Sequence, residues 1–288
     1  MREVTKEQVI EALQQVGIRP GDGLLVHSAI QYLGRPVGGV GMYLEALGEV
    51  TNCEWRMGNG DISRVESNSA FQIPNPQFLT PNSQFLIGTI AVPTFNFAFA
   101  RGEAYDPEFT PSRDMGAFSE YVRQQPEALR TPHPMQSLAV LGRYAEDLAN
   151  RDTSCAFDPG SAFERMLELD FKLLLLGADV QAVSMVHYSE QRLGVPYRYW
   201  KEFTGQVKTP SGWQVRTYKM FARHLEIDPQ LNLHPIQTLL EQRGLWRSQR
   251  VNYGTVACCR LADFVQAADD ILTQDIWGLV VKRLKVDD

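Results

Sequence analysis

Short apolar runs of strand length alternate along this chain with segments of helical periodicity. Gly23–His27 and Lys172–Leu176 are almost continuous apolar runs, and residues 87–92 form a third. Each run has the length and composition of a buried strand and is followed by small residues, glycine or proline. Because strands and helices alternate, the sequence predicts an α/β fold.

The first 196 residues contain the other elements of this pattern. Thr5 and Gln8 have the spacing of a capping box at the start of an amphipathic N-terminal helix. Gly194 and Pro196 are stop signals for a helix that ends at Leu193. The expected helices are 1–17, 42–50, 117–124, 162–168 and 183–193, and a further strand is expected at 138–141.

The character of the chain changes after residue 197. Two stretches of β type, 203–208 and 213–219, flank Pro210-Ser211-Gly212, which is a hairpin signal. The elements expected beyond them are a helix at 235–243, a strand at 251–260 and a helix at 261–272. We therefore expect residues 1–196 to form an α/β core, with residues 197–288 as a smaller C-terminal α+β subdomain packed on it.

A tandem seven-residue repeat interrupts the core region. Residues 73–79 read IPNPQFL and residues 80–86 read TPNSQFL. Prolines in both copies exclude a continuous helix, and two copies are too few for a solenoid. We expect residues 51–86 to be an insertion loop of extended character between a helix and the strand that follows it.

Charge and cysteine usage exclude several classes of function. The net charge is −6, so the surface lacks the excess of Lys and Arg that nucleic-acid binding requires. The same charge is compatible with a cationic substrate, although solubility alone also explains it. The four cysteines form no C-x-x-C pair, so no zinc or other metal site is predicted. No apolar run reaches the roughly 20 residues of a membrane span, and no secretion signal is present, so we expect a cytoplasmic protein without a membrane partner.

His187 and Glu190 are the first candidates for chemistry. They stand three residues apart on a predicted helix, which places them on one face, with Ser184 one turn earlier. A carboxylate beside an imidazole fixes its tautomer, and the ring can then take a proton from an attacking nucleophile. The same spacing also occurs in exposed His-Glu pairs that have no catalytic role. No nucleotide-binding P-loop and no G-x-S-x-G nucleophile motif is present.

A second candidate region follows the first predicted strand. His27 lies at the end of that strand, where ligands of α/β sheets gather, but its position alone favours a satisfied, half-buried histidine. The glycines at 34, 38, 39 and 41 precede a predicted helix. Their backbone amides can approach a pyrophosphate at the helix N-terminus, or the glycines can serve a tight turn.

Taken in order, short motifs along the chain resemble the aminoglycoside 3-N-acetyltransferase family. The resemblance covers most of residues 20–50 and 87–195 and, more weakly, 250–272. Its pieces are Val26-His27-Ser28, Gly38-Gly39, Val92-Pro93-Thr94-Phe95, Tyr105-Asp106-Pro107, Thr110-Pro111-Ser112, Arg130-Thr131-Pro132-His133-Pro134 with Ser137, Gly160-Ser161, Leu174-Leu175-Leu176-Gly177, and Ser184 to Glu190. The fold that it implies has a mostly mixed central sheet with helices on both faces.

The resemblance also implies a reaction and a set of residues. It implies acetyl transfer from acetyl-CoA, with His187 as general base and Glu190 as the group that orients it. Ser28 and Thr94 are candidates for stabilising the tetrahedral oxyanion. We expect Ser28, Gly39 and Thr94 to line one groove that accepts acetyl-CoA. The full set of cofactor-binding residues that it implies is His27, Ser28, Gly38, Gly39, Thr94, His133, Ser137 and Ser161.

The acceptor is less defined than the reaction. The family implies a small-molecule amine, either the 3-amino group of an aminoglycoside or an amine of another amino sugar, such as a nucleotide-linked one. A relative that binds a metabolite without catalysis is the third alternative, and a homodimer is one open oligomeric state. Ala29 and Ala162 depart from the family pattern, where a serine and a proline are usual. Arg198 and Lys201 would be poor neighbours for a polyamine.

Overall fold

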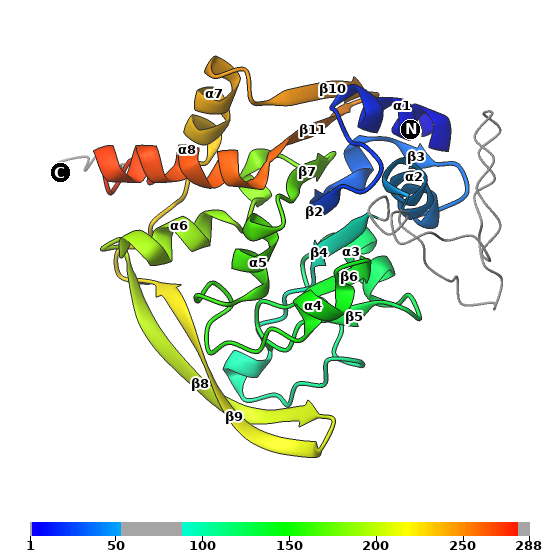
Figure 1. Ribbon diagram of the computed structural model, residues 1–288. Helices are drawn as coiled ribbons and strands as arrows, with labels where there is room; N and C mark the ends of the chain where they lie inside the picture. Colours follow the sequence, from blue (N-terminus) through cyan, green and yellow to red (C-terminus); the bar gives the residue numbers. More distant parts are fainter. Residues whose placement is uncertain (1, 53–87, 282–288) are drawn as a thin grey trace.

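A single mixed sheet organises the computed structural model, which describes residues 2–52 and 88–281. The predicted insertion loop with its tandem repeat lies almost entirely outside the described residues. The 7-stranded sheet has the order β10-β11-β7-β2-β4-β6-β5 (Figure 1). Its strands are β2 (Gly23–Ser28), β4 (Thr89–Pro93), β5 (Leu129–Arg130), β6 (Leu138–Gly142), β7 (Lys172–Leu176), β10 (Arg247–Val251) and β11 (Gly254–Arg260).

The central strand β2 is parallel to both of its neighbours, β4 and β7. The outer pairs β4–β6, β5–β6, β7–β11 and β10–β11 are antiparallel. The sheet is therefore mixed, with its parallel part in the middle. The carboxyl ends of β2, β4 and β7 meet at one edge, which is where an α/β sheet binds its ligands.

Side chains of β7 show why the sheet needs helices on both faces. Leu173 and Leu175 belong to one apolar core and Leu174 and Leu176 to the other, because successive side chains of a strand point to opposite faces. The first core packs under α4 (Ala145–Ala149), α5 (Ala162–Glu168), α6 (Val186–Leu193), α7 (His234–Gln242) and α8 (Leu261–Gln274). The second packs under α1 (Lys6–Gln15), α2 (Gly41–Thr51) and α3 (Gly116–Arg123).

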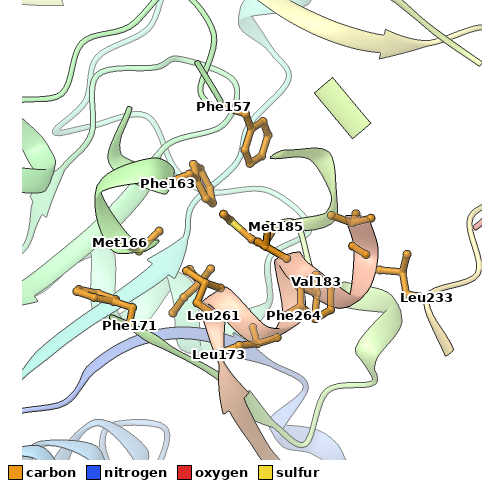
Figure 2. Close-up of a cluster of buried hydrophobic side chains, with 14 of the residues drawn as sticks. Phe157, Phe163, Met166, Phe171, Leu173, Val183, Met185, Leu233, Leu261 and Phe264 are labelled. Carbon is orange, nitrogen blue, oxygen red and sulfur yellow. The ribbon is translucent and has the colours of Figure 1, made fainter. Parts of the chain in front are cut away.

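The larger core is dense in aromatic and branched side chains (Figure 2). Phe264 and Leu261 of α8 meet Val183 and Met185, which precede α6, over the surface of β7. This packing fixes the start of α6 relative to the sheet. The position of α6 matters because it contains both predicted catalytic residues.

The N-terminal helix begins later than predicted. Thr5 is extended, with φ −99° and ψ 163°, and forms a capping box with Gln8, so the helix begins at Lys6. The residues before it form β1 (Glu3–Val4), which pairs in parallel with β3 (Arg35–Pro36). The prediction of helix before Thr5 was therefore wrong, while the predicted cap is confirmed.

Two further element boundaries differ from the prediction. The strand expected at 251–260 is split by a turn at Asn252, whose φ is 52°, so that β10 and β11 form a hairpin. The helix expected from Val183 begins at Val186, because the preceding residues form a 3₁₀ turn at Val180–Ala182. Similar short turns occur at Ile30–Tyr32 and Phe99–Arg101.

A long hairpin follows α6 and extends away from the central sheet (Figure 1). It consists of β8 (Arg198–Thr209) and β9 (Gly212–Arg223), joined where Pro210-Ser211-Gly212 predicted a turn. β10 and β11 then return to the central sheet, and α8 packs in the larger core. The chain after residue 197 thus contributes two strands, the edge strand β10 and its neighbour β11, to the same sheet as the first 196 residues.

Candidate active site

His187 and Glu190 meet on the first turns of α6. Nδ1 of His187 lies 2.6 Å from Oε2 of Glu190. The Glu190 side chain is 0% exposed, whereas that of His187 is 29% exposed. Such a short contact with a carboxylate requires that Nδ1 carry the proton and donate it. The second ring nitrogen, Nε2, is then left as the proton acceptor.

Arg198 contacts both members of this pair, and the sequence analysis did not predict these contacts. It is the first residue of β8, and its Nε lies 2.8 Å from Oε2 of Glu190. Its Nη2 is 3.2 Å from Nδ1 of His187, and its Nη1 donates to the carbonyl oxygen of Phe221 at 3.2 Å. The guanidinium therefore anchors the carboxylate to the base of the hairpin.

Charge compensation keeps Glu190 ionised although it is buried. Burial opposes ionisation of this carboxyl group. The hydrogen bond from His187 and the charges of His187 and Arg198 outweigh burial and hold the pKa of Glu190 below its usual range. A permanent carboxylate can orient the imidazole and stabilise a positive charge that forms on it.

A pocket of about 400 Å³ lies between α6 and the base of the hairpin. The Phe157 ring meets the His187 ring edge-on, with centroids 5.9 Å apart. It lies tilted by 41° against Phe163 of the larger core, with centroids 4.5 Å apart (Figure 2). Gln191 is fixed because it donates to Asp158 at 2.8 Å and accepts from the Cys155 thiol at 3.0 Å. The described lining residues are Phe95, Phe97, Gln136, Phe157, His187, Gln191, Arg198, Tyr199, Lys201, Phe203, Met220, Phe221, Ala222, Arg223 and Leu225.

His27 connects the sheet edge to α6 through Ser184. Its Nε2 lies 3.1 Å from the backbone N of Ser184 and 3.1 Å from the Ser184 Oγ. The carbonyl oxygen of Ser184 in turn accepts from the backbone N of His187 at 3.1 Å. Burial lowers the pKa of His27 to about 3, so the ring is neutral and accepts through Nε2. The expectation that Ser184 lies on the catalytic helix was wrong, because it precedes the helix and contacts His27.

Thr94 and Ser137 lie together at the ends of β4 and β6. Their hydroxyl oxygens are 3.1 Å apart, and Ser137 also donates to the Thr94 carbonyl oxygen at 3.0 Å. Nε of Arg130 contacts both hydroxyls, at 3.2 Å and 3.0 Å. Both side chains are fully buried. The structure thus groups two predicted cofactor residues around one guanidinium.

The remaining predicted cofactor residues occupy separate positions. His133 accepts from the backbone N of Gln136 at 3.1 Å through Nδ1, and its Nε2 lies 3.3 Å from the carbonyl oxygen of Lys219. Ser161 is the N-cap of α5 and accepts from the backbone N of Glu164 at 3.3 Å. The side chains of His133 and Ser161 therefore already form hydrogen bonds with backbone groups of the protein.

The loop before α2 is open. Gly38 and Gly39 have φ of 94° and 82°, and a Cβ placed on Gly39 would meet nothing within 4 Å. Ser28, the last residue of β2, bridges to Gly177 after β7. Among the described residues that line the His187 pocket, none is a predicted cofactor residue. The groove expected to join Ser28, Gly39 and Thr94 stays a prediction.

Residues 2–52 and 88–281 also bear on metal-binding and membrane-spanning classes of protein. Within these ranges no group of three or more His, Cys, Asp or Glu side chains could hold a metal ion. No helix in the same ranges is long and apolar enough to cross a membrane.

Comparison with known proteins identifies the family. Residues 86–273 match the family described as aminoglycoside 3-N-acetyltransferase. Aminoglycoside N(3)-acetyltransferase III of Salmonella sp is 29% identical over 198 residues, which are 68% of this chain and 63% of that relative. The match with this relative therefore spans less than two thirds of its length.

Solved structures share the fold. AAC-IIIb in a binary complex with CoASH has a TM-score of 0.74 at 20% identity, over 95% of this chain and 97% of that chain. AAC-VIa bound to sisomicin has a TM-score of 0.72 at 20% identity, over 95% and 98%. The predicted fold, a mixed sheet with helices on both faces, is confirmed. On the extent of the family match, the chain belongs to the aminoglycoside 3-N-acetyltransferase family.

Proposed function

We propose that this protein is an acetyl-CoA-dependent N-acetyltransferase that acts on an amino group of an aminoglycoside or a related amino sugar. The observation that carries the proposal is the contact of His187 with the buried Glu190 carboxylate at the wall of a pocket. The names of the relatives support the reaction, and they favour the 3-amino position of an aminoglycoside. A structural neighbour in complex with CoASH supports the acyl donor.

The residues suit direct transfer from donor to acceptor. An ammonium group is not a nucleophile, so the acceptor amine must lose a proton as it attacks the thioester carbonyl carbon. Nε2 of His187 takes that proton, and Glu190 stabilises the imidazolium that forms. Arg198 holds Glu190 in place through the contact of 2.8 Å. The C–N bond forms first and gives a tetrahedral oxyanion; as this collapses the C–S bond breaks, and the imidazolium of His187 returns its proton to the leaving thiolate.

The region before α2 fits the diphosphate of acetyl-CoA. No side chain caps the N-terminus of α2, so the positive end of its helix dipole is open to an anion, although the backbone N–H groups of Met42 and Tyr43 donate to the carbonyl oxygens of Gly39 and Val40 at 3.3 Å and 3.2 Å. Gly38 and Gly39 precede it in left-handed conformations, with no side chain between backbone and solvent. Ser28 and Thr94 lie at the ends of β2 and β4 and remain our candidates for polarising the thioester carbonyl. Of these two, Thr94 has its hydroxyl committed to Ser137 and Arg130.

The test is release of CoA thiol with a panel of aminoglycosides and other amino sugars. We expect His187→Ala to lower kcat by roughly 10²–10⁴, the usual contribution of general-base catalysis. His234→Ala is the matched control, because His234 also contacts a carboxylate, Asp179 at 3.3 Å, but lies on the exposed start of α7. A near-normal kcat for His187→Ala, with a pH profile that follows the acceptor amine alone, would refute the role of His187 as the base.

One observation favours the second acceptor class, another amino sugar. Arg198, Lys201 and Arg223 line the pocket, and its described lining contains no carboxylate. Aminoglycosides carry several ammonium groups, which these cations would repel. The intact contact between His187 and Glu190 counts against a relative that binds a metabolite without catalysis.

A further inference from the structure

The charges around the His187 pocket are not balanced. Glu190 compensates Arg198 at 2.8 Å, and Asp228 lies 3.5 Å from Arg223. For Lys201, no carboxylate partner is found in the part of the chain that the structure describes. Lys201 is therefore the cation of the pocket whose charge remains available to a ligand.

The pairing of β8 with β9 places Lys201 on the pocket side of the hairpin. Alternate residues of β8, namely Tyr199, Lys201 and Phe203, all line the pocket. Their partners across the hairpin include Ala222 and Met220, which line it too. Because side chains alternate along a strand, these residues form one continuous face. The Nζ of Lys201 lies 5.2 Å from the Phe203 ring centroid, a cation–π contact on the same face of the hairpin.

The two carboxylates near this face, Glu202 and Asp158, contact residues other than Lys201. Glu202, the neighbour of Lys201 on β8, pairs with Lys219 at 3.2 Å. Asp158 is not part of the described lining and accepts from the Gln191 amide at 2.8 Å. No acid of the described lining is available to receive an ammonium group of a polyamine.

We propose that the acceptor carries an anionic group, a phosphate or a carboxylate, which Lys201 binds while the acceptor amine reaches His187. This inference rests on the proposed function and names its substrate class. One negative charge on the acceptor satisfies Lys201, and a ring hydroxyl or ring face can contact Gln191 and Tyr199. The family's name does not imply an anionic acceptor. The inference comes from the charges of the residues that line this pocket.

The test measures acceptor binding by calorimetry on the full chain saturated with CoA, so it does not depend on turnover. The two anionic probes are glucosamine 6-phosphate and 2-amino-2-deoxyglucuronic acid. The comparison probes are glucosamine, which has no anionic group, and the polyamine sisomicin. We expect at least one anionic probe to bind about tenfold more tightly than glucosamine, with a preference that weakens as salt is added. The phosphate and carboxylate probes show which anion the pocket prefers.

Lys201→Glu should abolish this preference, and Lys208→Glu is the matched control. Lys208 lies on the same strand and also sits over an aromatic ring, that of Trp213 at 5.4 Å, but does not line the pocket. Equal or tighter binding of glucosamine or sisomicin, absence of binding by both anionic probes, or equal effects of the two lysine variants would each overturn the inference. Failure of the proposed function has a different signature: no binding of CoA, or no loss of thiol release in His187→Ala.

Discussion

His27 at the end of β2 holds Ser184, and Ser184 holds the first turn of the catalytic helix. Nε2 of His27 lies 3.1 Å from the backbone N and 3.1 Å from the Oγ of Ser184, and the Ser184 carbonyl oxygen accepts from the His187 backbone N at 3.1 Å. His27 is thus a positioning residue for α6. Its neutral state is required, because the ring accepts a hydrogen bond from the Ser184 N–H.

This relationship predicts a pH-dependent loss of stability. The pKa of His27 is about 3 in the folded protein because the ring is buried, against about 6.5 in an unfolded chain. Above about pH 6.5 the ring is neutral in both states. Between about 6.5 and 3 the unfolded chain binds a proton that the native state does not, so stability falls as pH falls. At about pH 5 the expected loss from His27 is about 2 kcal/mol.

The measurement is chemical unfolding at about pH 7.5 and about pH 5. His27→Gln supplies a neutral acceptor, so it should reduce the loss of stability between the two pH values. His133 titrates in the same direction, with a pKa of about 4, and accounts for part of the remaining loss. In the control His234→Gln, a change at an exposed ring, the pH dependence should equal that of the wild type. Equal pH dependence of His27→Gln and wild type would contradict the prediction.

The two ends of the predicted insertion meet. Thr51, the last residue of α2, is fully buried and accepts from the Gly21 backbone N at 2.9 Å. A Cβ placed on Gly88 would lie only 2.6 Å from the Thr51 Cβ, so the chain returns to the place that it left. The insertion therefore begins after Thr51, which belongs to the core, and not at it.

We expect that replacing residues 53–87 by a short Gly-Ser linker preserves the fold. The linker has to span only the gap between Asn52 and Gly88, and a shorter loop costs less closure entropy. Tm should change by no more than about 4 °C, which corresponds to about 1 kcal/mol in a domain of this size. Extending the deletion to include Thr51 is the control and should lower Tm further. A collapse of Tm in the first variant would show that the segment belongs to the core.

Local patterns predicted the elements whose signals lie within a few residues. The bounds of β7 and α5 were predicted to the residue; β7 is a buried apolar run, and the structure shows Ser161 as the N-cap of α5. His187 and Glu190 were found because helical spacing alone brings them together. The Asn252 turn was missed, although Asn252 followed by Gly254 is a turn signal that could have shown it.

Contacts between residues that only the tertiary fold brings together could not be predicted from local sequence patterns. Arg198 reaches Glu190 only because the chain reverses after Gly194, whose φ is 66°, and starts the hairpin beside α6. His27 and Ser184 are 157 residues apart in sequence. The resemblance to a known family pointed to the regions around His27 and Glu190. It predicted neither the contact of His27 with Ser184 nor that of Arg198 with Glu190. Tertiary packing of the larger core decides both.

Gly39 offers a direct test of the predicted cofactor site. Its φ is 82° and its missing Cβ faces open space, so Gly39→Ala adds backbone strain of about 1–2 kcal/mol without a steric clash. Gly102→Ala is the matched control, since its φ is 89° and its surroundings are equally open. Calorimetry should show CoA affinity lowered about tenfold in Gly39→Ala alone. Equal CoA affinity in the two variants would remove this loop from the cofactor site.

The buried ion pair between Glu190 and Arg198 should contribute to both stability and activity. Arg198→Met removes the guanidinium that lies 2.8 Å from the fully buried Glu190 carboxylate, so it should destabilise the fold by about 3–5 kcal/mol. Adding Glu190→Gln removes the uncompensated charge. The double variant should therefore recover much of the lost stability while remaining poorly active, because the amide does not stabilise an imidazolium. Denaturant unfolding and kcat of both single variants and the double variant test this. If the double variant is as unstable as the sum of the singles, the two side chains do not act as a pair.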